Sequence, residues 1–396
     1  MRILFVTTSY PRNPADSAGI FVARLVRTLK ERGHSLKVIA PGDPNAPDEN
    51  REDGVRVLRV PYAWPRRRMK LAYGSGGIPE RLRRTPSAIL QAPGLAAAMA
   101  RAVVREARGA DVIHAQWSFA GAIGRVAAEV SGVPLVLTTR GNFEMNASGV
   151  FGRARDWAIR GAQAVVTVNE KFADALRARG VPSRRIHAIS NGVAPRPGRA
   201  ARRAAARESL GMRADETALV NVGNLAPAKG VDLFIPAMAT LGTPARHGLY
   251  VIGGGERRAD LARAAAAVGC ADRIHWVGPV APERVDDWLD AADLFVFPSL
   301  GEGRPNAVLE AMASELPILA SDLPEVRELI DPGRTGRLFR TGDAGHLAAG
   351  LRDFLANPRE WDALGMAARE DLERRDLTWS ACASRYESVY EEVGRR

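Results

Sequence analysis

The sequence predicts an α/β protein built of two doubly wound parallel-sheet domains. The 396-residue chain is long enough for about two domains of ~100–200 residues. Short apolar runs alternate with amphipathic helical stretches in both halves, as they do in parallel-sheet proteins. A Pro-, Gly- and Arg-rich stretch separates the halves. We therefore expect domains at 1–190 and 214–376, a linker at 191–213 and a C-terminal helix at 377–396.

The first half opens with an apolar run at 2–8, which is typical of a strand buried on both faces. A helix at 20–32 follows, with Leu25, Val26 and Leu29 on one face, and Gly33 ends it. The remaining elements expected in this half are strands at 36–40, 55–60, 111–115, 134–139 and 164–168, and helices at 94–108, 120–131 and 170–179.

The second half repeats the alternation and ends in an amphipathic helix at 378–393. Its other expected elements are strands at 218–222, 249–252, 274–277, 293–297 and 317–320, and helices at 230–241, 257–268, 282–291, 305–314, 323–330, 343–356 and 358–373. Ligands of open α/β sheets lie beyond the carboxyl ends of the strands. A cleft between the two domains is therefore the expected site.

Composition excludes several classes of protein. Hydrophobic residues at 46% and charged residues at 26% are ordinary for a folded protein and exclude disordered and fibrous classes. The two cysteines form no CxxC pair, so neither a disulfide framework nor a structural zinc site is expected, and a cytoplasmic location fits. No uninterrupted apolar stretch of about 18 residues occurs, so no helix is expected to span a membrane.

Charge is distributed unevenly along the chain. Residues 1–195 hold 30 basic and 15 acidic side chains, whereas residues 196–396 hold 26 and 30. Within the segment 61–93, the basic clusters 66–70 and 81–84 alternate with apolar residues, namely Trp64, Met69, Leu71, Tyr73, Ile78, Leu82 and Ile89. This pattern suits docking on an anionic membrane, and a solvated basic loop is the alternative. No zinc-finger, RNP or helix-turn-helix signature is present, so nucleic acid is not an expected partner.

Two glycine-containing loops of the second half suit an anionic ligand. In VGNLAPAKG, Lys229 stands directly before a helix, where its charge and the helix dipole both favour a phosphate. In VIGGGE, three glycines around Gly254 follow a strand and allow close backbone approach to a ligand. A surface lysine and a plain tight turn are the respective alternatives.

The segment PSLGEGRPNAVLEAM carries two glutamates eight residues apart, Glu302 and Glu310. Glu302 lies in a glycine-flanked loop after a strand, and Pro305 suits the first turn of the helix that holds Glu310. The free backbone N–H groups of residues 306–308 suit phosphate oxygens, and the two carboxylates suit sugar hydroxyl groups. The alternative is a pair of solvated acids.

The first half offers two further candidates. Gly19 stands at a helix start after the first strand, a position that suits contact with an anion, although a helix-start glycine needs no ligand. His114 ends the apolar run DVIHA, so we expect it to face the cleft, with a packed histidine as the alternative.

These segments resemble the family 4 glycosyltransferases, retaining enzymes with the two-Rossmann-domain GT-B fold. The resemblance covers essentially the whole chain through YPRNPADSAGIFV, ADVIHAQW, SNGV, VGNLAPAKG, VIGGGE and EGRPNAVLEAMA. It implies two domains that face each other across a cleft, and a final helix that crosses back to pack on the first domain.

The resemblance also implies roles for individual residues. Lys229 would bind the donor diphosphate, Glu302 the hydroxyls of the donor sugar, and Glu310 the nucleotide ribose. The other donor-binding positions it implies are Gly19, Asn224, Gly254, Val280 and the backbone of Asn306, Ala307 and Val308, with 276–280 flanking the base. No metal or other cofactor is expected, and the sequence holds no Asp-x-Asp pair.

The chain departs from the family pattern at several positions. Asn224 stands where the family usually has arginine, and Arg140-Gly141 stands where His-Gly is common. Gln116 replaces the second histidine of a common strand-end pair, and Glu315 replaces a frequent glycine. We hypothesise that Arg140 supplies the positive charge that Asn224 lacks. The catalytic candidates are therefore Glu302, Lys229, Arg140 and His114.

The predicted function is retaining, metal-independent transfer of a hexose from a uridine or guanosine diphosphate sugar. The expected acceptor is a glycan or a lipid-linked molecule in polysaccharide or lipopolysaccharide assembly. The expected location is the cytoplasm, with peripheral binding of 61–93 to the inner membrane face. Two alternatives stay open: a sugar-nucleotide epimerase on the same fold, and a catalytically weak donor-binding or scaffold protein.

Overall fold

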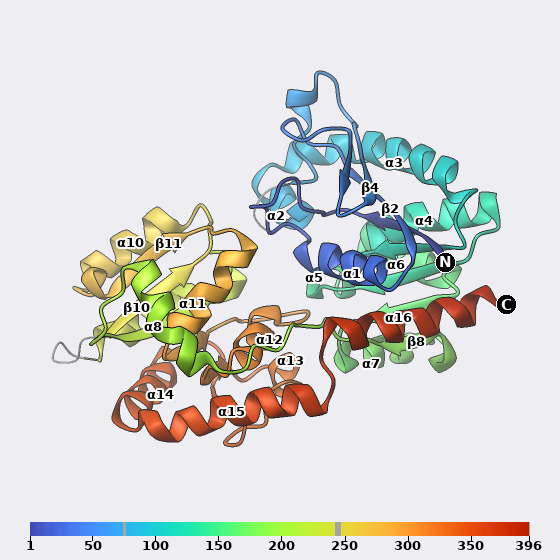
Figure 1. The fold of residues 1–396 in the computed structure, drawn as a ribbon. Helices are drawn as coiled ribbons and strands as arrows, with labels where there is room; N and C mark the ends of the chain where they lie inside the picture. Colours follow the sequence, from blue (N-terminus) through green and yellow to red (C-terminus); the bar gives the residue numbers. More distant parts are fainter. Residues whose placement is uncertain (74–76, 242–246, 396) are drawn as a thin grey trace. The chain divides into compact units, whose positions relative to one another are not determined.

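The computed structural model describes residues 1–73, 77–241 and 247–395. The chain divides into two compact units (Figure 1). Unit 1 comprises Met1–Asn191 together with the C-terminal segment from Trp379, and unit 2 comprises Gly192–Thr378. Each unit is described below by itself.

Unit 1 is built on a sheet with the strand order β3-β4-β2-β1-β5-β6-β7-β8 among its described residues. All neighbouring strands are parallel except β3, which is antiparallel to β4. The strands are β1 Arg2–Thr7, β2 Ser35–Pro41, β3 Glu49–Glu52, β4 Val55–Val60, β5 Val112–Gln116, β6 Leu135–Thr139, β7 Ala164–Thr167 and β8 Ile186–Ala188. Chain order reverses between β1 and β5, which makes their carboxyl ends the topological switch point.

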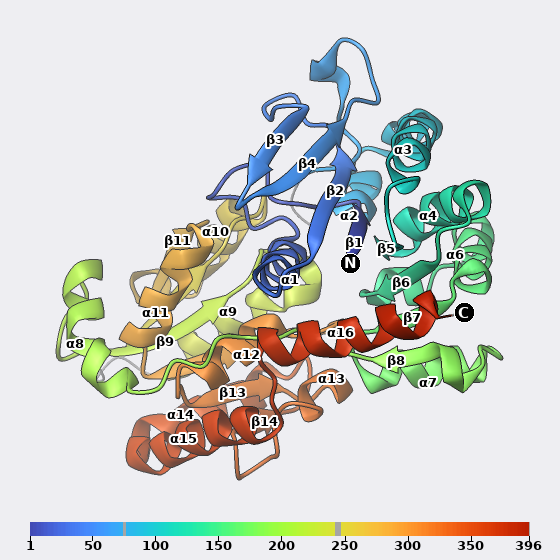
Figure 2. The same cartoon turned by 45° about the vertical axis from the view of Figure 1, so that its right-hand side comes forward.

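Helices cover both faces of this sheet. They are α1 Ile20–Glu31, α2 Gly77–Arg84, α3 Ala92–Ala107, α4 Ser118–Ser131, α5 Asn142–Met145, α6 Gly149–Gly161, α7 Glu170–Ala178 and α16 Trp379–Gly394. Leu4 and Val6 of β1 belong to the core that also contains residues of α3, α4, α6 and α7, whereas Ile3 and Phe5 belong to the core that contains residues of α1 and α16. The final helix therefore completes the core of unit 1, beside α1 (Figure 2).

Unit 2 contains a parallel sheet with the order β11-β10-β9-β12-β13-β14 among its described residues. Its strands are β9 Thr217–Val222, β10 His247–Ile252, β11 Ile274–Gly278, β12 Leu294–Phe297, β13 Ile318–Ser321 and β14 Arg337–Phe339. Its helices are α8 Arg199–Leu210, α9 Phe234–Ala239, α10 Arg258–Ala267, α11 Val285–Ala291, α12 Asn306–Ala313, α13 Pro324–Arg327, α14 Ala344–Ala356 and α15 Pro358–Arg374. The predicted class of two doubly wound parallel-sheet domains is confirmed.

The segment expected as a linker, 191–213, contains helix α8. This helix is fixed to α11 and to the start of β12 by ion pairs from its arginines. Arg202 pairs with Asp290, and Arg203 and Arg207 pair with Asp293 at 2.7 and 2.6 Å. The expectation of a linker throughout 191–213 is therefore wrong, because the Arg-rich composition belongs to a helix that packs through charges.

Several elements were not expected from the sequence. They are the strands β3, β8 and β14 and the helices α2, α5 and α6. The three strands are three or four residues long, which is too short for a period-2 pattern to be distinguished.

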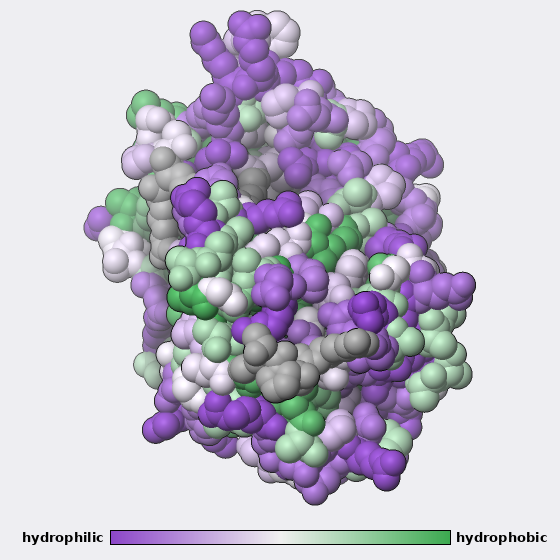
Figure 3. Space-filling view, turned by 90° about the vertical axis from the view of Figure 1, so that its left-hand side faces the viewer, coloured by the Kyte–Doolittle hydropathy of each residue, from purple (hydrophilic) through white to green (hydrophobic). Residues whose placement is uncertain are grey.

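One helix is long and apolar enough to cross a membrane by length and composition. It spans Pro86–Ala107, whereas no such helix was expected. Leu95, Met99, Val103 and Ala107 of this segment lie in the core of unit 1. A single helix of this kind among the described residues is weak evidence for a membrane span. The face at the left of Figure 1 is mostly hydrophilic, with hydrophobic residues in small groups (Figure 3).

Candidate functional site

The predicted donor loops follow two adjacent strands of unit 2. β9 lies between β10 and β12, so chain order reverses between β9 and β12. The loop that carries Lys229 follows β9, and the loop that carries Glu302 follows β12. Both loops therefore lie at the switch point, where doubly wound sheets bind ligands.

Lys229 and Glu302, which are 73 residues apart in sequence, form an ion pair. Lys229 Nζ donates to Glu302 Oε1 at 2.6 Å. The lysine side chain is 29% exposed, whereas that of the glutamate is 8% exposed. The ammonium group of Lys229 thus remains accessible to a ligand, whereas the carboxylate of Glu302 is buried.

The two loops are also tied through Ala228. The backbone N–H of Leu300 donates to the carbonyl of Ala228 at 2.8 Å. Ser299 Oγ lies 3.1 Å from the same carbonyl and 2.6 Å from Glu302 Oε1. Ser299, which the sequence analysis did not single out, therefore orients the carboxylate, and the pair is prepared before any ligand binds.

The glycine triplet after β10 packs against the loop after β9. Gly253 has φ +139°, and a Cβ there would lie 1.9 Å from the carbonyl oxygen of Gly223. Leu225 N–H donates to the carbonyl of Gly254 at 3.0 Å. The triplet thus supports close contact between two loops of the site, which is a sufficient reason for glycine here without a ligand.

Helix α12 begins at Asn306, so Pro305 is the residue before the helix and not part of its first turn. Asn306 N–H donates to the carbonyl of Arg304 at 2.9 Å, and Val308 N–H donates to that of Pro305 at 3.0 Å. Two of the three amides expected to hold phosphate, those of Asn306 and Val308, are therefore engaged within the turn in this structure. Ala307 and Glu310 of the same helix are each partly buried.

The remaining predicted donor positions lie around the same loops. Asn224 Oδ1 accepts from the backbone N–H of Ala226 at 3.2 Å, so this side chain stabilises the turn that leads to Lys229. Val280, which follows β11, is partly buried against the core of unit 2. Trp276 of β11 is partly buried, and its carbonyl accepts from Arg258 Nη2 at 2.8 Å.

Two predicted residues of unit 1 lie beyond the carboxyl ends of strands, Gly19 in the segment after β1 and Arg140 directly after β6. Gly19 directly precedes α1 with φ +67°, and a Cβ there would lie 2.2 Å from the carbonyl oxygen of Ser9, so this backbone requires glycine. Arg140 follows β6 and is 6% exposed.

The Arg140 guanidinium is fixed on three sides. Nε donates to Gln116 Oε1 at 2.5 Å, and Nη1 donates to Asn191 Oδ1 at 2.8 Å. The group stacks over the ring of Phe21 at 4.8 Å. Its Nη2 atom is buried and has no hydrogen-bond partner among the described residues. No role for Gln116 or Asn191 was predicted from the sequence.

His114 does not face a cleft, and that expectation is wrong. β5 continues to Gln116, and the imidazole of His114 is fully buried. Its Nδ1 lies 2.7 Å from the hydroxyl of Tyr390 on α16, and its Nε2 lies 2.8 Å from Thr138 Oγ1. Burial, with the nearby charge of Arg140, lowers the pKa of His114 well below its usual value. A neutral histidine without access to substrate is not a catalytic residue.

Glu144 of α5 is a buried acid that the sequence analysis missed. Its side chain is buried, and burial raises its pKa to about 8, although hydrogen bonds from Ser118 oppose this shift. Ser118 Oγ donates to Glu144 Oε1 at 3.2 Å. No sequence signal marked this residue, because its burial depends on the helices packed around it.

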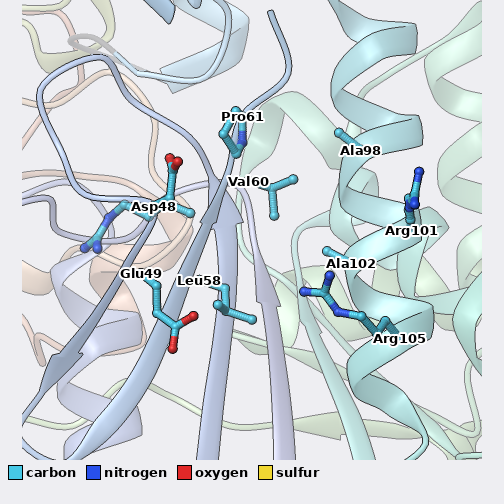
Figure 4. Close-up of a pocket in the computed structure, with 10 residues that line it drawn as sticks. Asp48, Glu49, Leu58, Val60, Pro61, Ala98, Arg101, Ala102 and Arg105 are labelled. Atoms are coloured by element: carbon cyan, nitrogen blue, oxygen red, sulfur yellow. The ribbon is translucent and has the colours of Figure 1, made fainter.

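A cavity of about 380 Å³ lies elsewhere in unit 1, between β4 and α3 (Figure 4). Leu58 and Val60 of β4 face Ala98 and Ala102 of α3, and Arg105 lies beside them. None of the predicted site residues lines it. Among the described residues, no group of three or more His, Cys, Asp or Glu side chains is arranged to hold a metal ion.

Comparisons with known proteins identify the family. The family described as "Glycosyl transferase 4-like domain" matches residues 18–192, and that described as "Glycosyl transferases group 1" matches residues 216–357. D-inositol 3-phosphate glycosyltransferase of Thermobispora bispora is 31% identical over 313 residues, which cover 72% of this chain and 71% of that protein. The chain belongs to the family 4 glycosyltransferases.

Solved structures agree with this assignment at the level of the fold. Sucrose-phosphate synthase from Thermosynechococcus elongatus has a TM-score of 0.78 at 23% identity and covers 99% of each chain. Anabaena HepE, in complex with UDP and glucose, has a TM-score of 0.77 at 18% identity and covers 99% of this chain and 100% of that one. The fold is GT-B, and this protein is a glycosyltransferase, as its resemblance to the family predicted.

Proposed function

We propose that this glycosyltransferase moves a hexose from a nucleoside-diphosphate sugar to a glycan or lipid-linked acceptor, with retention of configuration and without a metal. The observation that carries the donor half of this proposal is the Lys229–Glu302 pair at the switch point of unit 2. A cation beside a buried, oriented carboxylate matches a diphosphate joined to a sugar. The UDP-bound HepE structure makes a uridine nucleotide the first donor to test, with guanosine as the alternative.

In the proposed reaction the bond between the anomeric carbon and the diphosphate oxygen breaks, and its electron pair leaves with the diphosphate. An acceptor hydroxyl oxygen bonds to the same carbon and gives its proton to the leaving diphosphate. Lys229 stabilises the charge that develops on the leaving group, and Glu302 accepts hydrogen bonds from the sugar hydroxyls. A well-placed donor of this kind contributes about 3–4 kcal/mol to catalysis. Glu310 would bind the ribose, and Arg140 would add positive charge from unit 1. Retention is the outcome that the family resemblance implies.

The donor is tested by a thermal-shift panel of uridine and guanosine diphosphate sugars. A ligand that binds only the native state raises the melting temperature. We expect one base to stabilise the protein, the effect to be lost in Lys229→Met, and the matched variant Lys30→Met to keep it, because Lys30 is exposed on α1 of unit 1. No stabilisation by any sugar nucleotide would refute the proposal.

The acceptor half of the proposal is membrane docking by the segment 61–93. Trp64 is 83% exposed and Leu90 is 81% exposed. Gln91 Nε2 donates to the carbonyl of Arg68 at 2.7 Å, which holds Leu90 beside the basic stretch 66–70. Met69, Leu71 and Tyr73, which were expected on this surface, are instead buried, and residues 74–76 lie outside the described residues. The docking surface proposed here is therefore Trp64, Ile89, Leu90 and the basic residues 67, 68 and 70.

Vesicle sedimentation tests this surface. We expect binding to anionic vesicles that weakens with salt, since each basic residue near the surface contributes about 1 kcal/mol. The double variant Trp64→Ser, Leu90→Ser should lose binding, whereas Val130→Ser, which alters another exposed apolar residue of unit 1, should retain it. Equal binding by both variants would refute the docking surface and leave the donor proposal intact.

A further inference from the structure

A chain of buried hydrogen bonds connects the C-terminal helix with Arg140. The hydroxyl of Tyr390 lies 2.7 Å from His114 Nδ1, and His114 Nε2 lies 2.9 Å from Gln116 Nε2. Gln116 Oε1 accepts from Arg140 Nε at 2.5 Å. Tyr390, His114 and Gln116 are completely buried, so no solvent competes along this path.

Only one arrangement of protons satisfies this chain. Arginine can only donate hydrogen bonds, so the oxygen of the Gln116 amide must face Arg140 and its NH₂ group must face His114. His114 Nε2 must then accept, which places the ring proton on Nδ1, from where it is donated to the Tyr390 oxygen. The donor-only guanidinium of Arg140 therefore fixes both the orientation of the Gln116 amide and the tautomer of His114.

The histidine at the centre of the chain has little freedom to rearrange. Its ring lies 4.6 Å from that of Phe5 and 5.0 Å from that of Tyr386. Thr138 Oγ1 lies 2.8 Å from His114 Nε2 and 3.1 Å from the hydroxyl of Tyr386. A hydroxyl can donate to Nε2 together with the amide, so this branch is compatible with the same tautomer.

We propose that Gln116, His114 and Tyr390 are positioning residues that hold Arg140 ready for an anionic group of the substrate. Together with Asn191, they occupy Nε and Nη1, which leaves Nη2 as the group for the ligand. Fixing a flexible side chain before binding removes an entropic cost from the bound state. The inference rests on the proposed function, in which Arg140 contributes positive charge, and it assigns a catalytic consequence to the final helix.

A double-mutant cycle tests whether Tyr390 acts through Arg140. Tyr390→Phe removes one buried hydroxyl group and should lower kcat about 10-fold with little change in the KM for acceptor. Arg140→Met should lower kcat about 100-fold. In the Arg140→Met background, Tyr390→Phe should have no further effect on kcat. Tyr73→Phe, which removes another buried hydroxyl in unit 1 that donates to the carbonyl of Pro41, should change kcat less than about twofold.

If Tyr390→Phe lowers kcat by the same factor in the wild-type and in the Arg140→Met background, the proposal is overturned, because a merely structural role is independent of Arg140. The cycle also separates this failure from a failure of the proposed function. If Arg140→Met turns over as fast as the wild-type, Arg140 has no role in transfer, and the positioning role falls with it.

A second measurement needs no substrate. ¹⁵N-labelled histidine spectra of the full chain, which has six histidines, report the tautomer of each ring. We expect the Nδ1–H tautomer for His114 in the wild-type and a loss of this preference in Arg140→Met, where the Gln116 amide is free to turn. An Nε2–H tautomer in the wild-type would overturn the inference whatever the activity. An Nδ1–H tautomer in a protein that binds no sugar nucleotide would instead refute the proposed function and leave the arrangement standing.

Discussion

Glu302→Gln should separate binding of the donor's sugar from binding of its diphosphate. The substitution keeps the shape of the side chain and its position beside Ser299, but it removes the charge that holds Lys229 Nζ at 2.6 Å. If Glu302 binds the sugar and Lys229 binds the diphosphate, the variant should lose affinity for the sugar nucleotide and should not lose affinity for the nucleoside diphosphate.

The structure sets the size of both effects. Hydrogen bonds to a charged group contribute about 1.5–3 kcal/mol, so affinity for the sugar nucleotide should fall about 10- to 100-fold. The ion pair in the free protein involves a lysine that is 29% exposed, so solvent screening limits its worth to about 1 kcal/mol. Releasing Lys229 from that pair should therefore raise affinity for the nucleoside diphosphate by up to about fivefold.

Isothermal titration with the sugar nucleotide and with the nucleoside diphosphate measures the two affinities separately. Lys229→Met should weaken the nucleoside diphosphate and the sugar nucleotide alike, about 10- to 100-fold. Glu315→Gln is the matched control, because this carboxylate accepts from the backbone of Gly198 and pairs with Arg369 at 3.0 Å. It should change stability without changing either affinity. Equal losses of both ligands in Glu302→Gln would refute the assignment of Glu302 to the sugar.

Two further predictions concern stability. Gly253→Ala should destabilise unit 2 by about 3 kcal/mol in denaturant unfolding, because the new Cβ would clash with the Gly223 carbonyl and φ is positive. Gly211→Ala is the control, since Gly211 has a positive φ but open space around it, and it should cost about 1 kcal/mol. Equal costs for the two variants would contradict the close packing of the two loops. Glu144 has its pKa raised to about 8, so its protonated form favours the folded state and its contribution is lost as pH rises from about 4.5 towards 8. Relative to Glu144→Gln, the wild-type should lose up to about 1.4 kcal/mol per pH unit between pH 5.5 and 7.5, and a flat difference would contradict burial of this carboxyl.

The main strands could be predicted because a strand buried on both faces leaves a continuous apolar run. β1 shows this plainly, with Ile3 and Phe5 on one face and Leu4 and Val6 on the other. Helix α8 could not be predicted in the same way, because its packed face consists of arginines that pair with Asp290 and Asp293 more than 80 positions later. Its pattern has no apolar period to detect.

More of the donor site in unit 2 could be predicted from the sequence than of the candidate site residues in unit 1. The loops of Lys229 and Glu302 each follow a recognisable strand, and the order of strands in a doubly wound sheet brings the two loops together. The environment of His114 depends on Tyr386 and Tyr390, which lie more than 270 positions away on a helix that returns to unit 1. Its position in the sequence indicated a strand, but burial by a distant helix decided that it is no catalytic group.

Net charge and local charge have different consequences in this chain. Residues 196–396 carry four more acidic than basic side chains, yet the proposed diphosphate site lies among them. Several of these acids, such as Asp290, Asp293 and Asp371, are already paired with arginines. Charges farther apart than a Debye length of about 8 Å are largely screened at physiological salt, so a diphosphate responds to the cation within contact distance, Lys229.

The excess of 15 basic residues in 1–195 likewise includes both buried, paired charges and accessible ones. Arg59 and Arg140 are buried and engaged inside unit 1, so they attract no distant partner. The accessible share includes Arg67, Arg68 and Lys70, beside exposed Leu90. Long-range attraction to a membrane depends on accessible charges, which salt screens, so salt should weaken vesicle binding strongly. Transfer chemistry depends on charges fixed within contact distance of the substrate, so salt should lower turnover on a water-soluble acceptor only slightly.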